Sequence, residues 1–186
     1  MKKSLLLLAS LLPLYGCSQH APMATVEHVD IDRFMGDWYV IANIPTFLEK
    51  DAFNAIERYE KNDDGSIATT FSFNAGSFSG ERKTYHPTGF IKNSETNALW
   101  GMQFIWPIKA DYRIVYLDQD YTKTIIGRQA RDYVWVMSRK PVLSENEYAD
   151  MVELIGRLGY DTSKVKRVPQ NWPAATDKAK GNTESL

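Results

Sequence analysis

Hydrophobic and polar residues alternate in short runs from residue 29 onward, and turn-forming residues separate the runs. A period of two puts alternate side chains on opposite faces of an extended chain, so each run predicts one β-strand. Asp64-Gly65 lies between two runs and supplies the positive φ of a tight hairpin turn. Pro87 and Gly89 predict a bend in the fourth strand. The predicted strands span residues 37–44, 54–61, 66–74, 81–92, 98–106, 112–118, 123–127 and 133–139.

A helix is predicted after the last of these strands. Ser144 and Glu147 have the spacing of a capping box, which begins a helix, and Gly159 is a natural end. One apolar stripe at helical spacing follows the capping box. We expect this stripe to pack on the wall of the strands rather than on a partner protein. Its members are Tyr148, Met151, Val152 and Ile155. Residues 165–168 predict a short last strand.

The order of these elements predicts an all-β fold class. Strands at hairpin spacing are typical of an antiparallel barrel or a sandwich, and periodicity alone does not separate the two. Up-and-down connectivity with short loops favours the barrel, because closure also removes exposed strand edges. We therefore expect an eight-stranded antiparallel up-and-down β-barrel with one C-terminal α-helix packed on its wall.

The N-terminus has the composition of a targeting segment. Met1-Lys2-Lys3 is cationic, and the apolar run at 4–12 is shorter than the ~20 residues of a membrane span. Leu14-Tyr15-Gly16-Cys17 resembles the lipobox of bacterial lipoproteins, in which the cysteine is acylated. The resemblance implies a lipoprotein signal peptide at 1–16 and a lipidated tether at 17–28, anchored by acyl chains on Cys17. The alternative is a plain secretory signal with an incidental cysteine.

The residue after Cys17 bears on the destination of such a lipoprotein. In enteric-type bacteria an Asp at this position favours retention in the inner membrane, so Ser18 fits export. We expect a protein that is lipid-anchored in the outer membrane and faces the periplasm. The remaining boundaries are a folded domain at 29–170 and a polar, flexible tail at 171–186.

Charge and composition exclude several function classes. The chain has 186 residues, with 22 Lys plus Arg against 23 Asp plus Glu, so its net charge is −1. Loss of residues 1–16 would remove Lys2 and Lys3 and take this charge to −3. A balance so close to zero argues against a nucleic-acid partner. One cysteine excludes an intramolecular disulfide, and three histidines leave little material for a metal site or a catalytic triad.

Motifs of enzyme chemistry are also missing from the sequence. It contains no P-loop, no Rossmann glycine pattern and no H-E-x-x-H, and residues 76–80 do not form a nucleophile elbow. We therefore predict a binding protein rather than an enzyme, with no catalytic residue, no metal and no cofactor.

Three motifs in order carry a resemblance to the lipocalin family. Gly36-Asp37-Trp38 resembles the G-x-W that opens the first lipocalin strand, residues 118–121 look like the second motif, and residues 135–139 look like the third. The match is closer to the bacterial outer-membrane lipocalins and their apolipoprotein D-like relatives. It implies a calyx that is open at one end and binds and carries fatty acids or lysophospholipids. Some relatives form dimers, so the resemblance leaves a homodimer as an open alternative.

The same family pattern assigns structural roles to Gly36, Trp38 and Arg139. By that resemblance, we expect Trp38 to close the floor of the barrel and Arg139 to lie across its indole. A cation over a tryptophan face is worth ~0.5–2 kcal/mol. This set is therefore expected to hold the closed end together rather than to touch ligand.

Alternation also indicates which side chains face the interior of the barrel. Three strands carry a strongly apolar phase, and with the resemblance these phases predict the lining of a lipid cavity. The alternative is that the same side chains fill a closed core. The candidates are Ile67, Phe71 and Phe73, then Trp100, Met102 and Phe104, and finally Tyr112, Ile114 and Tyr116.

Two features have more than one interpretation. Glu57 shares its phase with Tyr59, and we hypothesise that it lies near the interior, where it pairs with an arginine such as Arg82 or meets a lipid headgroup. A register slip of one residue would turn it to solvent. Apolar side chains near the first connecting loop could touch a membrane, contact a second subunit or cover the open end. They are Phe47, Leu48 and Phe53.

The sequence thus predicts a lipocalin, anchored in the outer membrane, that binds fatty acids or lysophospholipids in its barrel. Its role would be lipid storage or transport in envelope maintenance. Two alternatives are kept. One is a lipid-modifying enzyme on the same scaffold, and the other is a structural envelope lipoprotein whose barrel is filled.

Overall fold

The computed structural model describes residues 21–172. Its strands are β1 (Gly36–Ile44), β2 (Ala52–Lys61), β3 (Ile67–Ala75), β4 (Arg82–Tyr85), β5 (Thr88–Ile91), β6 (Leu99–Ile105), β7 (Ile108–Leu117), β8 (Lys123–Gly127), β9 (Val134–Ser138) and β10 (Lys166–Arg167). Its helices are α1 (Ile31–Phe34), α2 (Glu145–Arg157) and the 3₁₀ turn η1 (Thr162–Lys164). The predicted signal peptide, Cys17 and residues 173–186 of the tail lie outside the described residues.

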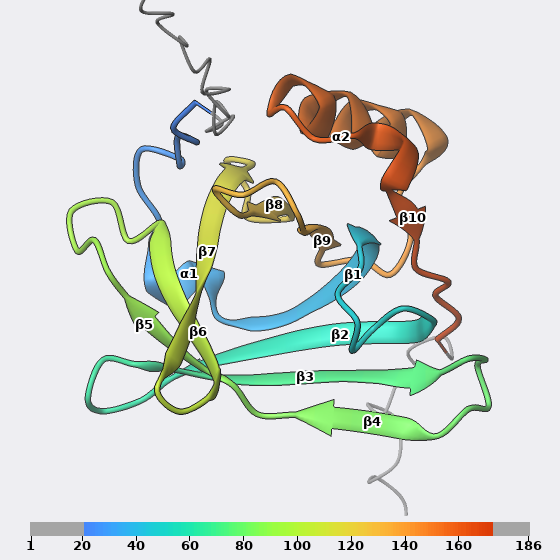
Figure 1. The fold of residues 1–186 in the computed structure, drawn as a ribbon, viewed down its shortest axis with the longest axis horizontal. Helices are drawn as coiled ribbons and strands as arrows, with labels where there is room; N and C mark the ends of the chain where they lie inside the picture. The colour runs from blue at the N-terminus through green and yellow to red at the C-terminus, as the bar shows by residue number, and fades with distance from the viewer. Residues whose placement is uncertain (1–20, 173–186) are drawn as a thin grey trace, which may run out of the picture.

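The strands form a closed antiparallel barrel, as predicted. The paired strands follow the order β1-β2-β3-β5-β6-β7-β8-β9, and β9 pairs back onto β1 (Figure 1). The predicted fourth strand is divided into β4 and β5, which both pair with β3. Pro87 lies at the break and cannot donate to the ladder, so the bend expected there is present. Counted as one, β4 and β5 complete the eight strands of the barrel.

Strand β7 and helix α1 differ from the sequence prediction. Strand β7 begins at Ile108 rather than at residue 112, because Ile105 and Ile108 pair and the β6–β7 ladder continues to the turn itself. The short helix α1 was not predicted. Its four residues begin after Asp30, whose side chain accepts a hydrogen bond from Arg33 N. Helix α1 lies under the barrel and contributes the buried ring of Phe34 to it.

Helix α2 has the predicted capping box and packs on the outer wall. Ser144 accepts from the backbone of Glu147, while the Glu147 side chain accepts from the backbone of Ser144. Met151 and Ile155 are buried against the barrel in a cluster that includes Ile125. Figure 1 shows the helix outside the barrel, beside β1, β8 and β9. A second hydrophobic layer between helix and wall thus supports one side of the barrel.

Large rings close one end of the barrel. Trp38 is fully buried, and the Arg139 guanidinium carbon lies 3.8 Å from the centroid of its ring. Arg139 Nη2 donates to the carbonyl oxygens of residues 33, 34 and 35, and its Nη1 donates to that of Asp37. Gly36 has a φ of +91°, which favours glycine. Arg139 therefore ties α1 to the start of β1.

We expect Arg139→Ala to lower the free energy of unfolding by about 2–4 kcal/mol. It removes the cation over Trp38 and the charged donor of five carbonyl oxygens, including that of Tyr121. Denaturant unfolding measures the change, and Lys140→Ala, which removes the exposed neighbouring cation, is the control. Unchanged stability, or loss of ligand binding at full stability, would contradict the structural role.

Candidate functional site

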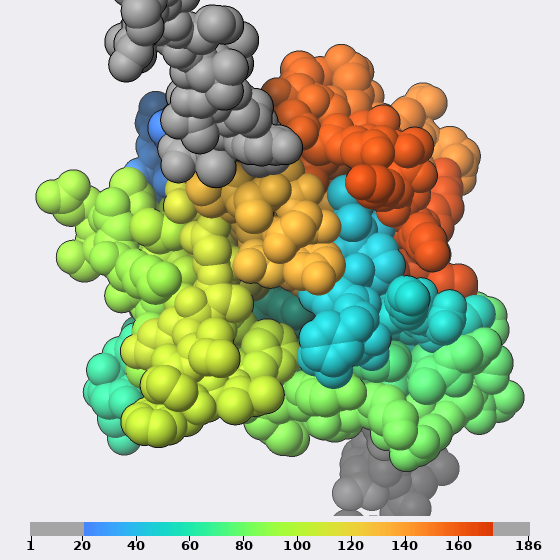
Figure 2. Space-filling view, viewed as in Figure 1, coloured from blue at the N-terminus to red at the C-terminus, as the bar shows by residue number. Residues whose placement is uncertain are grey.

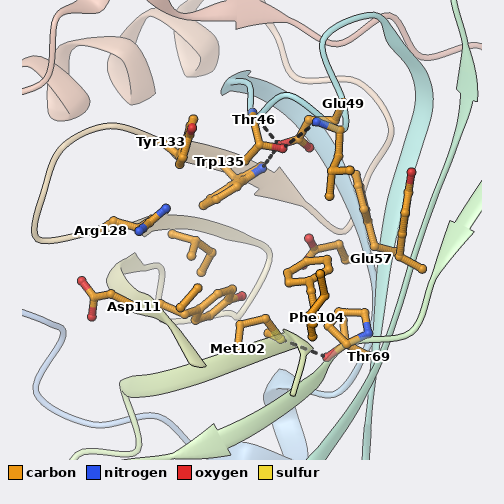
Figure 3. A pocket seen from close by; sticks show the side chains of 18 of the residues that line it. Thr46, Glu49, Glu57, Thr69, Met102, Phe104, Asp111, Arg128, Tyr133 and Trp135 are labelled. Atoms are coloured by element: carbon orange, nitrogen blue, oxygen red, sulfur yellow. Dashed lines mark hydrogen bonds between the residues drawn. The ribbon is translucent and has the colours of Figure 1, made fainter. Parts of the chain in front are cut away.

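A cavity of about 440 Å³ occupies the half of the barrel opposite Trp38 and Arg139. This volume is within the range of small-molecule pockets, ~300–1,000 Å³. Figure 2 looks toward its opening, which lies between the cyan β1–β2 loop, the yellow-green β6–β7 hairpin and the golden β8–β9 region. The lining is mostly apolar, and Figure 3 shows the few polar side chains that point into it. The cavity is thus shaped for a hydrophobic ligand.

Four of the side chains that were expected to line a cavity do so. Phe71 on β3, Met102 and Phe104 on β6, and Tyr112 on β7 all border this space. Thr69 Oγ1 also borders it and lies 3.9 Å from Met102 Sδ. Alternation along the strands therefore selected the inward face of β3, β6 and β7.

The other five candidates do not border the cavity. Ile67, Trp100 and Ile114 are fully buried nearer the closed end, where they belong to the main core. Phe73 packs between Phe71 and Tyr85, with ring centroids 5.3 and 6.3 Å away. Tyr116, considered below, is the fifth. Alternation predicts on which face of a strand a side chain lies, but not how deep along the barrel axis that side chain is.

Tyr116 faces the outside of the barrel, so it does not have the predicted role in lining the cavity. The β7–β8 register shifts between Ile114 and Tyr116, so an extra residue is inserted in β7 at this point. Such a bulge reverses the alternation beyond it. Tyr116 consequently packs with the cluster between the wall and α2, next to Val115. The expectation that it faces the cavity is therefore wrong.

Several lining residues were not among the cavity candidates of the sequence analysis. Glu49 in the β1–β2 loop is buried and accepts hydrogen bonds from Trp135 Nε1 at 2.9 Å and Thr46 N at 3.2 Å. Burial raises the pKa of Glu49, and these hydrogen bonds oppose the shift. Trp135 and Met137 alternate on β9, and that periodicity was the available signal. No periodic signal existed for the loop residue Glu49.

Glu57 faces the interior, which confirms the first part of the hypothesis about it. Tyr59 Oη donates to Glu57 Oε2 and lies 2.7 Å from Tyr112 Oη. Burial raises the pKa of Glu57 to about 8, and the charge of Glu49 adds to the shift. The proposed pair with Arg82 is wrong, because that guanidinium bonds to Ser72 Oγ and to the carbonyl oxygen of residue 54 instead. Glu57 is therefore protonated at neutral pH.

Arg128 is the cation that borders the cavity near its opening. Its Nη1 lies 3.3 Å from Asp132 Oδ2, and its guanidinium carbon lies 5.2 Å from the centroid of the Tyr133 ring. Its Nε is buried and has no hydrogen-bond partner in the described part of the chain. A buried donor of this kind is costly unless something binds it.

Exposed apolar side chains surround the opening. We call Phe47, Ile105, Trp106 and Ile108 the mouth patch; they are 81%, 71%, 82% and 68% exposed. Leu48 borders the cavity beside them, whereas Phe53 lies away from it and packs against Phe78 with ring centroids 5.0 Å apart. Large exposed apolar groups that gather at one place mark an interaction site.

Two searches of residues 21–172 concern other kinds of site. They contain no group of three His, Cys, Asp or Glu side chains arranged to hold a metal ion. They also contain no helix of the length and apolarity needed to cross a membrane.

Comparisons with known proteins agree with this architecture. The family model for a lipocalin-like domain matches residues 29–170. Temperature-induced lipocalin-1 of Arabidopsis thaliana is 32% identical over 164 residues, which are 80% of this chain and 83% of the plant protein. The outer membrane lipoprotein Blc of Escherichia coli K12 is 27% identical over 161 residues, which are 83% of this chain and 89% of Blc.

Solved structures share the fold at lower identity. Insecticyanin of Manduca sexta superposes with a TM-score of 0.64 at 17% identity, over 83% of this chain and 87% of insecticyanin. The cockroach allergen Per a 4 gives 0.61 at 18% identity, over 83% of this chain and 97% of the allergen. With the G-x-W at the closed end, the calyx and the family match over most of its length, this chain belongs to the lipocalin family.

Proposed function

We propose that this lipocalin binds fatty acids or lysophospholipids in its cavity and stores or transports them at the outer membrane. The observation that carries the proposal is the apolar cavity of about 440 Å³, open at one end of a closed barrel. Burial of an alkyl chain gains ~0.8 kcal/mol per CH₂. Association and ordering of the chain oppose much of that gain, so we expect micromolar or tighter binding.

The path of the N-terminal segment supports an anchor near the opening. Gln129, in the β8–β9 loop at the open end, donates through Nε2 to the carbonyl oxygen of Ala21 at 3.2 Å. Its Oε1 accepts from Met23 N at 2.9 Å. Cys17 is only four residues before Ala21, a span of at most about 14 Å. Acyl chains on Cys17 would therefore hold the open end, with its mouth patch, close to the membrane.

The relatives support the same location. The Blc proteins of Escherichia coli and of Citrobacter freundii carry the name outer membrane lipoprotein. Together with the lipobox at 14–17, these names favour lipid anchoring through Cys17 at the outer membrane.

The two alternatives make different demands. A structural lipoprotein with a filled barrel requires side chains in the space that the cavity leaves open. A lipid-modifying enzyme requires product to form from a bound lipid. Mass spectrometry of lipid extracted from the purified chain, before and after incubation with candidate lipids, measures occupancy and turnover together. Retained, unmodified lipid supports the carrier.

Filling the cavity should weaken binding of a lipid. We expect Ala110→Trp, on the inward face of β7, to weaken binding of a fluorescent fatty acid at least about tenfold. Fluorescence titration of residues 18–186 measures the affinity. Ala68→Trp places the same ring on the opposite phase of β3 and should bind as the parent does. Equal binding by the parent and Ala110→Trp would place the ligand elsewhere and refute the proposal.

The mouth patch should bind a lipid surface. We expect Ile105→Asp with Trp106→Asp to reduce flotation of residues 18–186 with vesicles of phosphatidylethanolamine and phosphatidylglycerol by about fivefold or more. Val142 is 69% exposed and follows β9 at the closed end, so Val142→Asp is the matched control. If parent and double variant float equally, or if the parent forms a dimer that the double variant does not, the patch has another role.

A further inference from the structure

The floor of the cavity carries hydrogen-bonding groups within an otherwise apolar interior. Glu57 on β2 is the register partner of Trp38 on β1, so it lies toward the closed end. The ring of Tyr112 stacks on Trp100 with centroids 5.3 Å apart. Glu57 and Tyr112 both border the cavity, and the hydroxyl of Tyr59 joins them from behind. We call these three residues the polar floor.

Counting protons on the polar floor leaves one donor unused. Tyr59 donates to Glu57 Oε2, so Tyr112 donates to Tyr59 across the 2.7 Å contact. Both phenolic protons are then engaged. The second oxygen of Glu57 has no hydrogen-bond partner among the described residues, and Figure 3 shows this carboxyl directed into the cavity. The acid proton of Glu57 therefore faces the space that a ligand would occupy.

Charge at the floor disfavours an anion. Glu57 has no ion-pair partner in the described part of the chain, and its burial raises its pKa to about 8. Glu49 and Asp111 also border the cavity, and the charge of Glu49 raises the pKa of Glu57 further. Arg128, with its unpartnered Nε, borders the cavity near the opening instead. An anionic headgroup is accordingly matched to the opening, and the far end of a ligand meets a neutral acid.

We propose that the polar floor binds a hydroxyl group at the far end of the ligand, so that the preferred ligands are lipids with a hydroxyl remote from an anionic head. The hydroxyl accepts from the Glu57 acid and donates to an oxygen of the floor. A methyl terminus leaves the acid without a partner, which is costly in an apolar interior. This inference rests on the proposed lipid-binding function and specifies its ligand class.

Matched pairs of acids test the proposal. The probes are dodecanoic and hexadecanoic acid, their ω-hydroxy counterparts and the corresponding dicarboxylic acids, each displacing a fluorescent fatty acid from residues 18–186. We expect Glu57→Leu to weaken the ω-hydroxy acids about tenfold and to leave the unsubstituted acids equal or tighter. Glu57→Gln retains a donor and should retain the hydroxyl preference. The dicarboxylic acids should bind most weakly to the parent, because one carboxylate would reach the floor.

The outcomes separate the two proposals. If no acid displaces the probe from the parent, the proposed lipid-binding function fails and the inference fails with it. If the acids bind but Glu57→Leu changes hydroxylated and unsubstituted acids by the same factor, only the inference fails. Tyr112→Phe, which keeps the ring on Trp100, changes a second residue of the polar floor and should weaken only the ω-hydroxy acids.

The protonation of Glu57 has its own measurement. With a pKa raised from 4.5 to about 8, the folded state binds more protons than the unfolded chain between these values. Stability should therefore fall as pH rises from about 4.5 to about 8. Glu57→Gln should flatten this fall in denaturant unfolding, and Glu60→Gln, exposed on the same strand, should not. Equal slopes for the parent and Glu57→Gln would overturn a neutral polar floor.

Other titratable groups around the cavity remain in both proteins, and among them the charge of Glu57 acts on Glu49 and Tyr112, so the measured difference belongs to this coupled set. The other titratable groups are Glu49, Tyr59, Tyr85, His86, Asp111, Tyr112, Arg128 and Tyr133.

Discussion

Packing of aromatic rings at the closed end determines where the barrel can hold a ligand. An eight-stranded barrel is just wide enough to be filled by side chains or to hold one small ligand. Here Phe34 contacts Trp38, Tyr59 and Trp100, with ring centroids 5.1, 5.6 and 5.7 Å away. These rings fill the barrel above α1, and the space begins only where they end. Arg139 fixes this arrangement from below, since it binds the carbonyl oxygens of the segment that supplies Phe34.

The same packing explains how far sequence reasoning could reach. Alternation predicted the strands and the inward phase of β6 correctly, because period two is a local property of the chain. It could not separate Trp100, in the closed-end core, from Met102, which borders the cavity. The two differ only in depth, which depends on the stagger of strands around the barrel. The bulge before Tyr116 and the loop position of Glu49 likewise depend on the assembled wall.

Two buried polar groups illustrate the difference between a structural and a ligand-facing role. The Arg139 guanidinium donates hydrogen bonds to backbone carbonyl oxygens and lies over the face of Trp38. Its hydrogen-bonding groups are therefore satisfied without a ligand. Glu57 has one oxygen on Tyr59 and the other toward open space. A buried polar group that lacks a partner is destabilising, and such groups are usually satisfied. The cavity side of Glu57 is thus where the interior is incomplete without a bound group.

The topology also brings the opening and the N-terminal segment to one end. Antiparallel strands place the β1–β2, β6–β7 and β8–β9 connections at the open end and the β7–β8 connection at the closed end. Ala21 contacts the β8–β9 loop through Gln129. From there the backbone of Val26 donates to Ile114 and that of Val29 to Thr96, before α1 covers the closed end of the barrel. If acyl chains on Cys17 hold a membrane at this end, as proposed above, a lipid that enters between Phe47 and Trp106 would cross little water. Under that proposal the mouth patch, a liability on a free protein, has a function, because the membrane that it would touch is the source of the ligand.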